Sequence, residues 1–167
     1  MSGKVLIAYA TRKGSTAEIA EAVGNELKAA GHSVEVKEMK TVTSVEGYTA
    51  IIIGAPMYAA KYIEAKKFVD RFRENITGLP VAAFAVGLAA VSKDPRLIDE
   101  TKNALQGSLD PIKPVSTTLF AGNLDGKKIS FITRKMVEHF GKVPAGDYRD
   151  WDAISAWGKE VAEKVGT

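Results

Sequence analysis

The chain has 167 residues, 46% of them apolar and 26% charged, which fits one soluble globular domain over residues 1–167. It has no cysteine, which excludes disulfides and thiolate chemistry and suits a cytoplasmic protein, and its two histidines disfavour a histidine-rich metal site. The net charge of +3 is a mild excess that fits either an evenly mixed surface or attraction to an anionic partner, cofactor, substrate or lipid surface, and no nucleic-acid recognition motif is present.

Short apolar runs alternate with helical patterns along the chain. We predict strands over residues 4–10, 33–39, 48–54, 80–87 and 115–120, and helices over residues 15–30, 63–72, 95–105, 129–140 and 151–165. In the last helix we expect Asp150 to be the N-cap, and Trp151, Ile154, Trp157 and Val161 to lie on or near a core-facing stripe. The run at 33–39 alternates apolar and charged residues, as an edge strand does. Buried strands separated by helices indicate parallel βαβ units. We therefore predict an α/β fold, a three-layer, doubly wound, five-stranded parallel sheet with the order 2-1-3-4-5.

The carboxyl ends of three predicted strands are where we expect a ligand. In a doubly wound sheet, ligands bind beyond the carboxyl ends of the strands, at the point where the strand order reverses. The loops at residues 11–16, 55–61 and 87–94 follow the first, third and fourth strands in the chain. These loops are therefore the candidate ligand-binding segments.

The loop after the first strand combines hydroxyl groups, a glycine and a helix start. Its residues are Thr11, Arg12, Lys13, Gly14, Ser15 and Thr16. Free N–H groups at a helix N-terminus bind phosphate, a glycine lets the backbone approach, and the hydroxyls and basic side chains add donors and charge. The loop lacks both the G-x-x-x-x-G-K-[ST] and G-x-G-x-x-G patterns, so we expect a single terminal phosphate. In the alternative interpretation, Ser15 and Glu18 form a capping box that only starts a helix.

Three segments resemble one known family. VLIAYATRKGSTAEIAEAVG is similar to the FMN-phosphate signature that follows the first strand of flavodoxins, although Lys13 stands where many of them have a hydroxyl residue. GAPMYAAKYIEAKKFV and GDYRDWDAISAW resemble the flavodoxin-domain group that includes menaquinone-dependent protoporphyrinogen oxidases. The resemblance implies a flavodoxin-like fold, with FMN as cofactor and its phosphate held by residues 11–16.

The same resemblance implies that two further loops hold the flavin ring. Their residues are Pro56, Met57, Tyr58, Ala59, Ala60 and Lys61 after the third strand, and Gly87, Leu88, Ala89 and Ala90 after the fourth. We expect Tyr58 to stack on the ring, Met57 to give a polarisable contact with it, and Lys61 to pair with reduced flavin or the phosphate. Alternatively, Tyr58 only covers the end of the sheet and Lys61 begins a solvated helix. Ala60 replaces a glycine found in relatives, so we expect a poorly stabilised neutral semiquinone.

Two features bear on the reaction. Residues 87–92 contain no aromatic residue, whereas many electron-carrying flavodoxins cover the flavin there with a tyrosine. An open flavin face favours two-electron chemistry with a quinone or a porphyrinogen-like molecule. Residues 127–142 place apolar side chains at helical spacing among basic ones, which indicates either a surface helix packed on the sheet or peripheral contact with an anionic membrane.

The expected function is that of an FMN-dependent oxidoreductase of the protoporphyrinogen or quinone type. It would pass electrons from an organic donor through the flavin to a quinone-type acceptor. No metal site is expected, and no side chain stands out as an obligatory catalytic acid or base. The alternatives are a flavodoxin that carries electrons between redox proteins and a flavin-free interaction domain. We expect a cytoplasmic location, with membrane association on the cytoplasmic face if residues 127–142 contact lipid.

Overall fold

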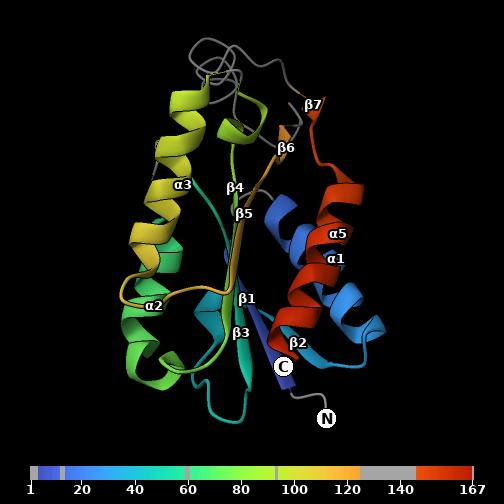
Figure 1. Cartoon of the computed structure of the whole chain (residues 1–167), viewed down its shortest axis with the longest axis vertical. Coiled ribbons are helices and arrows are strands. Elements are labelled where there is room, and N and C mark those ends of the chain that lie inside the picture. Colours follow the sequence, from blue (N-terminus) through green and yellow to red (C-terminus); the bar gives the residue numbers. More distant parts are fainter. Residues whose placement is uncertain (1–3, 12–13, 59–60, 93, 125–145, 167) are drawn as a thin grey trace.

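Five parallel strands form the centre of the molecule. The computed structural model describes residues 4–11, 14–58, 61–92, 94–124 and 146–166. The strands are β1 (Lys4–Tyr9), β2 (Ser33–Glu38), β3 (Ala50–Pro56), β4 (Val81–Val86) and β5 (Ser116–Phe120). Their order in the sheet is β2-β1-β3-β4-β5, and every neighbouring pair is parallel (Figure 1). The predicted α/β class and strand order are confirmed, and β2 is an edge strand as expected.

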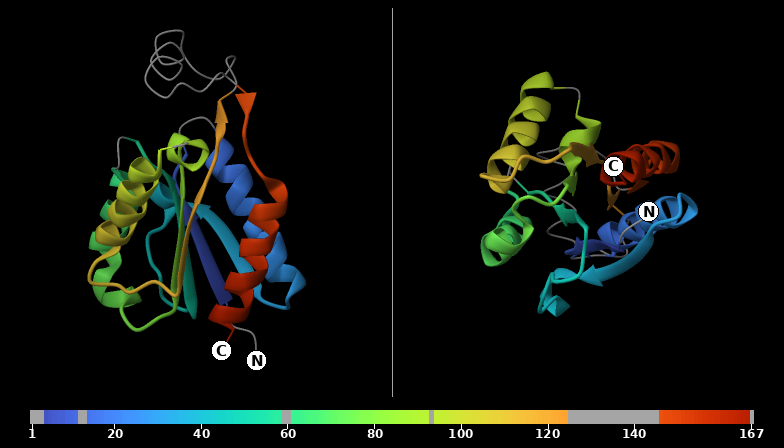
Figure 2. Two further views of the ribbon diagram at one scale, coloured as in Figure 1. Left: turned by 45° about the horizontal axis from the view of Figure 1, so that its top comes forward. Right: turned by 60° about the horizontal axis from the view of Figure 1, so that its bottom comes forward.

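Helices cover both faces of this sheet. The helices are α1 (Ser15–Ala29), α2 (Ile63–Ile76), α3 (Pro95–Leu109) and α5 (Trp151–Val165). Helices α1 and α5 lie side by side on one face, and α2 and α3 lie on the other (Figure 2). The apolar side chains of β1, β3 and β4 alternate between these two layers, because successive residues of a strand point to opposite faces. The result is the predicted three-layer arrangement.

A glycine in β3 makes room for the central aromatic cluster. A Cβ atom at Gly54 would lie 2.1 Å from Cζ of Phe84, so only glycine fits opposite this ring. The Phe84 ring packs against Phe120 and Trp157 at centroid distances of 5.8 and 5.7 Å. This cluster joins the sheet to α5, and it explains how α5 is held in place.

Several predicted boundaries differ from the structure. Helices α2 and α3 each extend four residues beyond their predicted ends, to Ile76 and Leu109. Strand β3 begins at Ala50 because its pairing with β1 begins there, opposite Val5. Asp150 caps α5 as expected, accepting a hydrogen bond from the backbone N–H of Ala153 at 3.0 Å.

One predicted core residue lies at the surface instead. The sequence placed Trp151 on or near the buried stripe of the last helix, and this prediction was wrong, because 44% of the residue is exposed. Ile154, Trp157 and Val161 of the same helix are buried as expected. Trp151 is the first residue of α5, where its ring lies beside the guanidinium of Arg149 rather than against the sheet.

A short antiparallel pair lies beyond the carboxyl end of the sheet. It consists of β6 (Asn123–Leu124) and β7 (Gly146–Asp147). The predicted helix over 129–140 and the basic segment over 127–142 lie outside the described residues. In the part of the chain that the structure describes, no helix is long and apolar enough to span a bilayer. No cluster of potential metal ligands was found there either.

Candidate functional site

The candidate site lies at the carboxyl ends of β1, β3 and β4. The strand order reverses at β1, whose neighbours are β2 on one side and β3 on the other. Backbone hydrogen bonds connect the strand ends here: Ala10 N–H donates to Gly54 O at 2.9 Å, and Met57 N–H donates to Val86 O at 2.9 Å. These hydrogen bonds fix the relative positions of the strand ends from which the three predicted ligand loops leave.

The loop between β1 and α1 ends in a tight turn. The N–H of Gly14 donates to the hydroxyl oxygen of Thr11 at 2.9 Å, and Gly14 has φ of +92°. A Cβ at Gly14 would meet no atom within 4 Å, so the backbone conformation, and not space, is the reason for a glycine here. Arg12 and Lys13 lie outside the described residues, so their predicted contacts with phosphate stay predictions.

The start of α1 differs from the capping-box alternative. The N-cap residue is Gly14, and no side chain caps the helix. Glu18 pairs with Arg149 across the molecule instead of turning back to the helix start. The N–H groups of the first turn lack partners within the helix and point outward at its N-terminal end, which is the arrangement that binds phosphate. Ser15 is half-buried at this end, whereas only 2% of Thr16 is exposed.

A glycine that sequence reasoning missed lies against this loop. A Cβ at Gly122 would be 2.9 Å from Cγ1 of Val86 and 3.4 Å from Oγ of Ser15. The chain leaving β5 therefore passes close to the first residue of α1. The available signal was a glycine two residues after a predicted strand, in a position where the backbone must approach another loop closely.

The loop after β3 closes into a tight turn. Tyr58 and Lys61 form two backbone hydrogen bonds, of 3.2 and 2.8 Å, around the predicted site residues Ala59 and Ala60, which lie outside the described residues. Tyr58 is 50% exposed and Lys61 is exposed, so both are open to a ligand. Met57 is buried in the core on the α2 side, and its predicted contact with the ring stays a prediction.

Tyr62 anchors this loop to the sheet. The sequence did not predict it as a site residue. Its hydroxyl donates to the carbonyl oxygen of Phe84 at 2.5 Å, from a fully buried position. Burial raises the pKa of the Tyr62 hydroxyl far above its usual value, so the group remains a proton donor. An aromatic residue directly after the loop and before a helix was the signal for this role.

The loop after β4 forms the short 3₁₀ helix η2 (Leu88–Val91). Leu88 and Ala90 are half-buried, and Ala89 is buried. Gly87 packs closely on the loop after β3, because a Cβ there would lie 2.9 Å from the carbonyl oxygen of Met57. The two predicted flavin-ring loops are thus in contact with each other.

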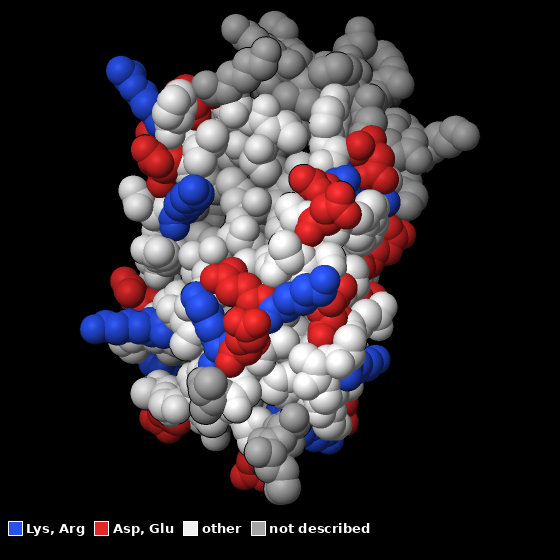
Figure 3. Space-filling view, turned by 45° about the vertical axis from the view of Figure 1, so that its right-hand side comes forward, with Lys and Arg blue, Asp and Glu red and all other residues white. Residues whose placement is uncertain are grey.

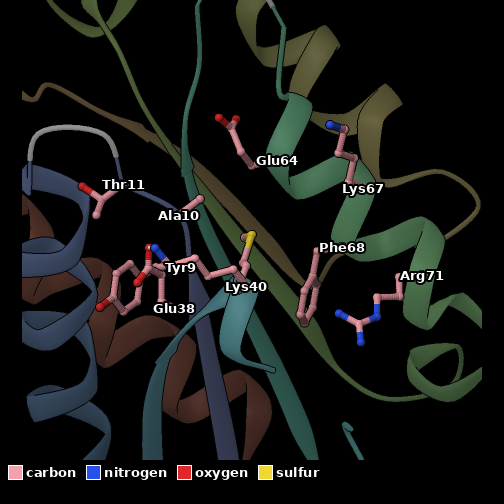
Figure 4. A pocket seen from close by; sticks show the side chains of 10 residues that line it. Tyr9, Ala10, Thr11, Glu38, Lys40, Glu64, Lys67, Phe68 and Arg71 are labelled. Atoms are coloured by element: carbon pink, nitrogen blue, oxygen red, sulfur yellow. The ribbon is translucent and has the colours of Figure 1, made fainter. Parts of the chain in front are cut away.

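A groove of about 410 Å³ opens beside Thr11, at the start of the candidate phosphate loop. Its lining residues come from the ends of β1 and β2, from the short 3₁₀ helix η1 (Met39–Thr41) and from α2: Tyr9, Ala10, Thr11, Glu38, Met39, Lys40, Glu64, Lys67, Phe68 and Arg71 (Figure 4). Met39 and Phe68 form a buried apolar floor. Lys67 and Arg71 lie one helical turn apart on α2, and Lys40 pairs with Glu38 at 3.1 Å. Apart from Thr11, the groove residues were not predicted as site residues.

The fold and the arrangement of these loops define a doubly wound protein whose candidate phosphate-binding loop follows the first strand. Residues 6–151 match the sequence profile of the flavodoxin domain family. The chain belongs to this family, whose cofactor is FMN. The uncapped α1 start and the glycines at 14, 87 and 122 suit that cofactor, since they bring bare backbone close together at the strand ends.

Comparisons with individual proteins point in two directions. The chain is 26% identical to protoporphyrinogen IX dehydrogenase [quinone] of Escherichia coli K12, over 95% of this chain and 94% of that protein. It is 36% identical to a flavodoxin of Nitratidesulfovibrio vulgaris, over 52% of this chain and 58% of that protein. An archaeal flavodoxin structure superposes with a TM-score of 0.59 at 22% identity, covering 98% of this chain and 99% of that one. A short-chain flavodoxin associated with a PDU bacterial microcompartment gives a TM-score of 0.61 at 13% identity, covering 99% of both chains. The two structures support the fold alone.

Proposed function

We propose that the protein is an FMN-dependent oxidoreductase that passes electrons from an organic donor through the flavin to a quinone-type acceptor, as a protoporphyrinogen oxidase does. The groove beside Thr11 is the observation that carries this proposal. Its apolar floor suits a flat ring system, and Lys67 and Arg71 suit carboxylate groups at the edge of such a molecule. A relative that is similar along almost its whole length is a protoporphyrinogen IX dehydrogenase.

The cofactor-binding residues belong to the same proposal. The phosphate would be held by Thr11, Arg12, Lys13, Gly14, Ser15 and Thr16, and the ring by residues 56–61 and 87–90. FMN, when bound, supplies the two-electron chemistry. The protein orients it through the backbone at Gly14 and through the exposed ring of Tyr58. Each two-electron, two-proton oxidation of the donor would reduce one quinone to its quinol, so no further co-reactant is needed.

Turnover without a partner protein tests the proposal. The FMN-loaded protein is mixed with protoporphyrinogen IX and menadione under anaerobic conditions, and protoporphyrin fluorescence is followed. We expect fluorescence to rise only when protein and quinone are both present. Failure of menadione to reoxidise the reduced protein would contradict the proposal.

The second candidate is a flavodoxin that transfers electrons between redox proteins. The similarity to the flavodoxin of N. vulgaris favours it. Such carriers commonly present acidic surfaces around the flavin, whereas this chain has a net charge of +3. The side face shown in Figure 3 carries both acidic and basic side chains. Rapid reoxidation by a protein acceptor such as cytochrome c, together with no reaction with free menadione, would favour the carrier.

Membrane contact through residues 127–142 completes the proposal, because quinones reside in membranes. These residues lie outside the described part of the chain, so the support is their sequence: apolar residues at helical spacing among lysines and arginines. Co-sedimentation with vesicles of phosphatidylglycerol, compared with phosphatidylcholine, tests this contact. We expect salt-sensitive binding to the anionic vesicles only. Equal recovery in the supernatant with both lipids would contradict it.

A further inference from the structure

Arg149 connects the chain leaving β7 to the first turn of α1. Its guanidinium pairs with Glu18 of α1 and with Asp147, at 2.8 Å between Nη2 and Oδ2. It also lies over the ring of Trp151, 4.8 Å from the centroid. Only 8% of the Arg149 side chain is exposed, although both carboxylates that it contacts are half exposed. The burial of the guanidinium distinguishes this contact from an ordinary ion pair between two solvent-exposed side chains.

This connection lies next to the candidate phosphate loop. The N–H of Tyr148 donates to Gly122 O at 3.2 Å, and Gly122 is the residue that approaches Ser15. Glu18 belongs to the first turn of α1, the turn whose free N–H groups would bind phosphate. A carboxylate in a first turn normally stabilises a helix. Beside a bound phosphate, however, the same carboxylate repels the ligand unless its charge is balanced.

We infer that Arg149 is a positioning residue for FMN, which balances the charge of Glu18 and holds the 147–149 segment against the start of α1. The inference rests on the proposal that residues 11–16 hold the FMN phosphate. Without Arg149, Glu18 and Asp147 would leave two unbalanced carboxylates near that phosphate. The expected consequence is a loss of affinity that depends on the phosphate of the ligand and on the carboxylate of Glu18.

A double-mutant cycle with two ligands tests the inference. Dissociation constants of FMN and riboflavin for the apoprotein are measured by flavin fluorescence at low salt for Arg149→Met, Glu18→Gln and the double variant. We expect Arg149→Met to weaken FMN about three- to ten-fold, to leave riboflavin within about two-fold, and to have a smaller effect on FMN in the presence of Glu18→Gln, where only Asp147 is left unbalanced. Added salt should reduce the effect. Glu21→Gln, which removes an exposed carboxylate from the same helix, is the matched control and should leave FMN affinity unchanged.

A merely structural role for Arg149 gives a different pattern. In that case FMN and riboflavin would weaken together and Glu18→Gln would restore neither, and this result would overturn the inference. Arg149→Lys keeps the charge but not the paired hydrogen bonds to Asp147, and it replaces Arg149→Met if the latter does not fold. Any loss of affinity should then be larger for FMN than for riboflavin, and an equal loss for both ligands would contradict the inference. Equal affinity of the wild-type protein for FMN and riboflavin would instead overturn the proposed phosphate site itself.

Discussion

In the buried core, the hydroxyl of Tyr62 donates a hydrogen bond to the carbonyl oxygen of Phe84, with 2.5 Å between the two oxygen atoms. This bond holds the end of the loop after β3 against β4. The predicted flavin-ring loops follow these two strands. Tyr62→Phe removes only the hydroxyl, so we expect a loss of about 1–2 kcal/mol in the free energy of unfolding, measured by urea denaturation. FMN affinity should fall as well, because the loop loses its anchor. Unchanged stability would show that the carbonyl finds another donor.

Gly14 and Gly107 offer a matched pair of glycine-to-alanine substitutions. A Cβ meets no atom within 4 Å at either site, but only Gly14 has a positive φ. Gly14→Ala should therefore destabilise the protein by roughly 1–2 kcal/mol. Gly107→Ala, in the exposed part of α3, should stabilise it by about 0.5–1 kcal/mol, because alanine is the better helix former.

Thermal unfolding of both apoprotein variants checks this prediction, and FMN titration adds a second readout. Only Gly14→Ala should weaken FMN binding, since Gly107 lies away from the strand ends. Equal effects of the two substitutions on stability would contradict the argument from backbone conformation.

Lys67 and Arg71, the two basic side chains of α2 that line the groove, should affect the binding of substrate and not that of FMN. Lys67→Gln combined with Arg71→Gln removes two positive charges from the groove. We expect KM for a carboxylate-bearing porphyrinogen to rise about ten-fold or more, with the Kd of FMN unchanged. Lys66→Gln is the control, because Lys66 lies on the same helix but pairs with Asp70 at 3.1 Å. An equal rise in KM with the control variant would rule out a specific role for the groove.

Glu35 should contribute to the acid sensitivity of the fold. Lys4, Tyr48 and Lys37 bind its carboxylate and lower its pKa to about 2. Since this pKa is lower in the folded state than in the unfolded one, the contribution is present above about pH 4.5 and is lost as pH falls towards 2. Urea unfolding between pH 6 and pH 2.5 should show a shallower acid decline for Glu35→Gln than for the wild type. Glu21→Gln should leave the slope unchanged.

Much of the fold could be predicted because it follows from local patterns. Apolar runs of strand length, separated by helical repeats, specify a parallel sheet with helices on both faces. The boundaries were less predictable, because pairing between strands decides them: β3 starts at Ala50 since that residue pairs with Val5 of β1. The burial of Trp151 could likewise not be predicted from the local sequence pattern. Its position in a helical stripe did not reveal that it lies at the first residue of the helix, beyond the sheet.

The sequence by itself determined the class of fold, the three loops at the strand ends and the family to which the phosphate loop belongs. The tertiary structure decided which distant residues meet there. Arg149 reaches Glu18 across 131 positions of the chain, and Gly122 approaches Ser15 only because β5 and α1 end at the same edge of the sheet. Such contacts arise from packing between elements, which a residue pattern within one element cannot encode. The candidate phosphate loop could therefore be predicted from its residues, whereas the residues that contact it from distant parts of the chain could be found only in the folded structure.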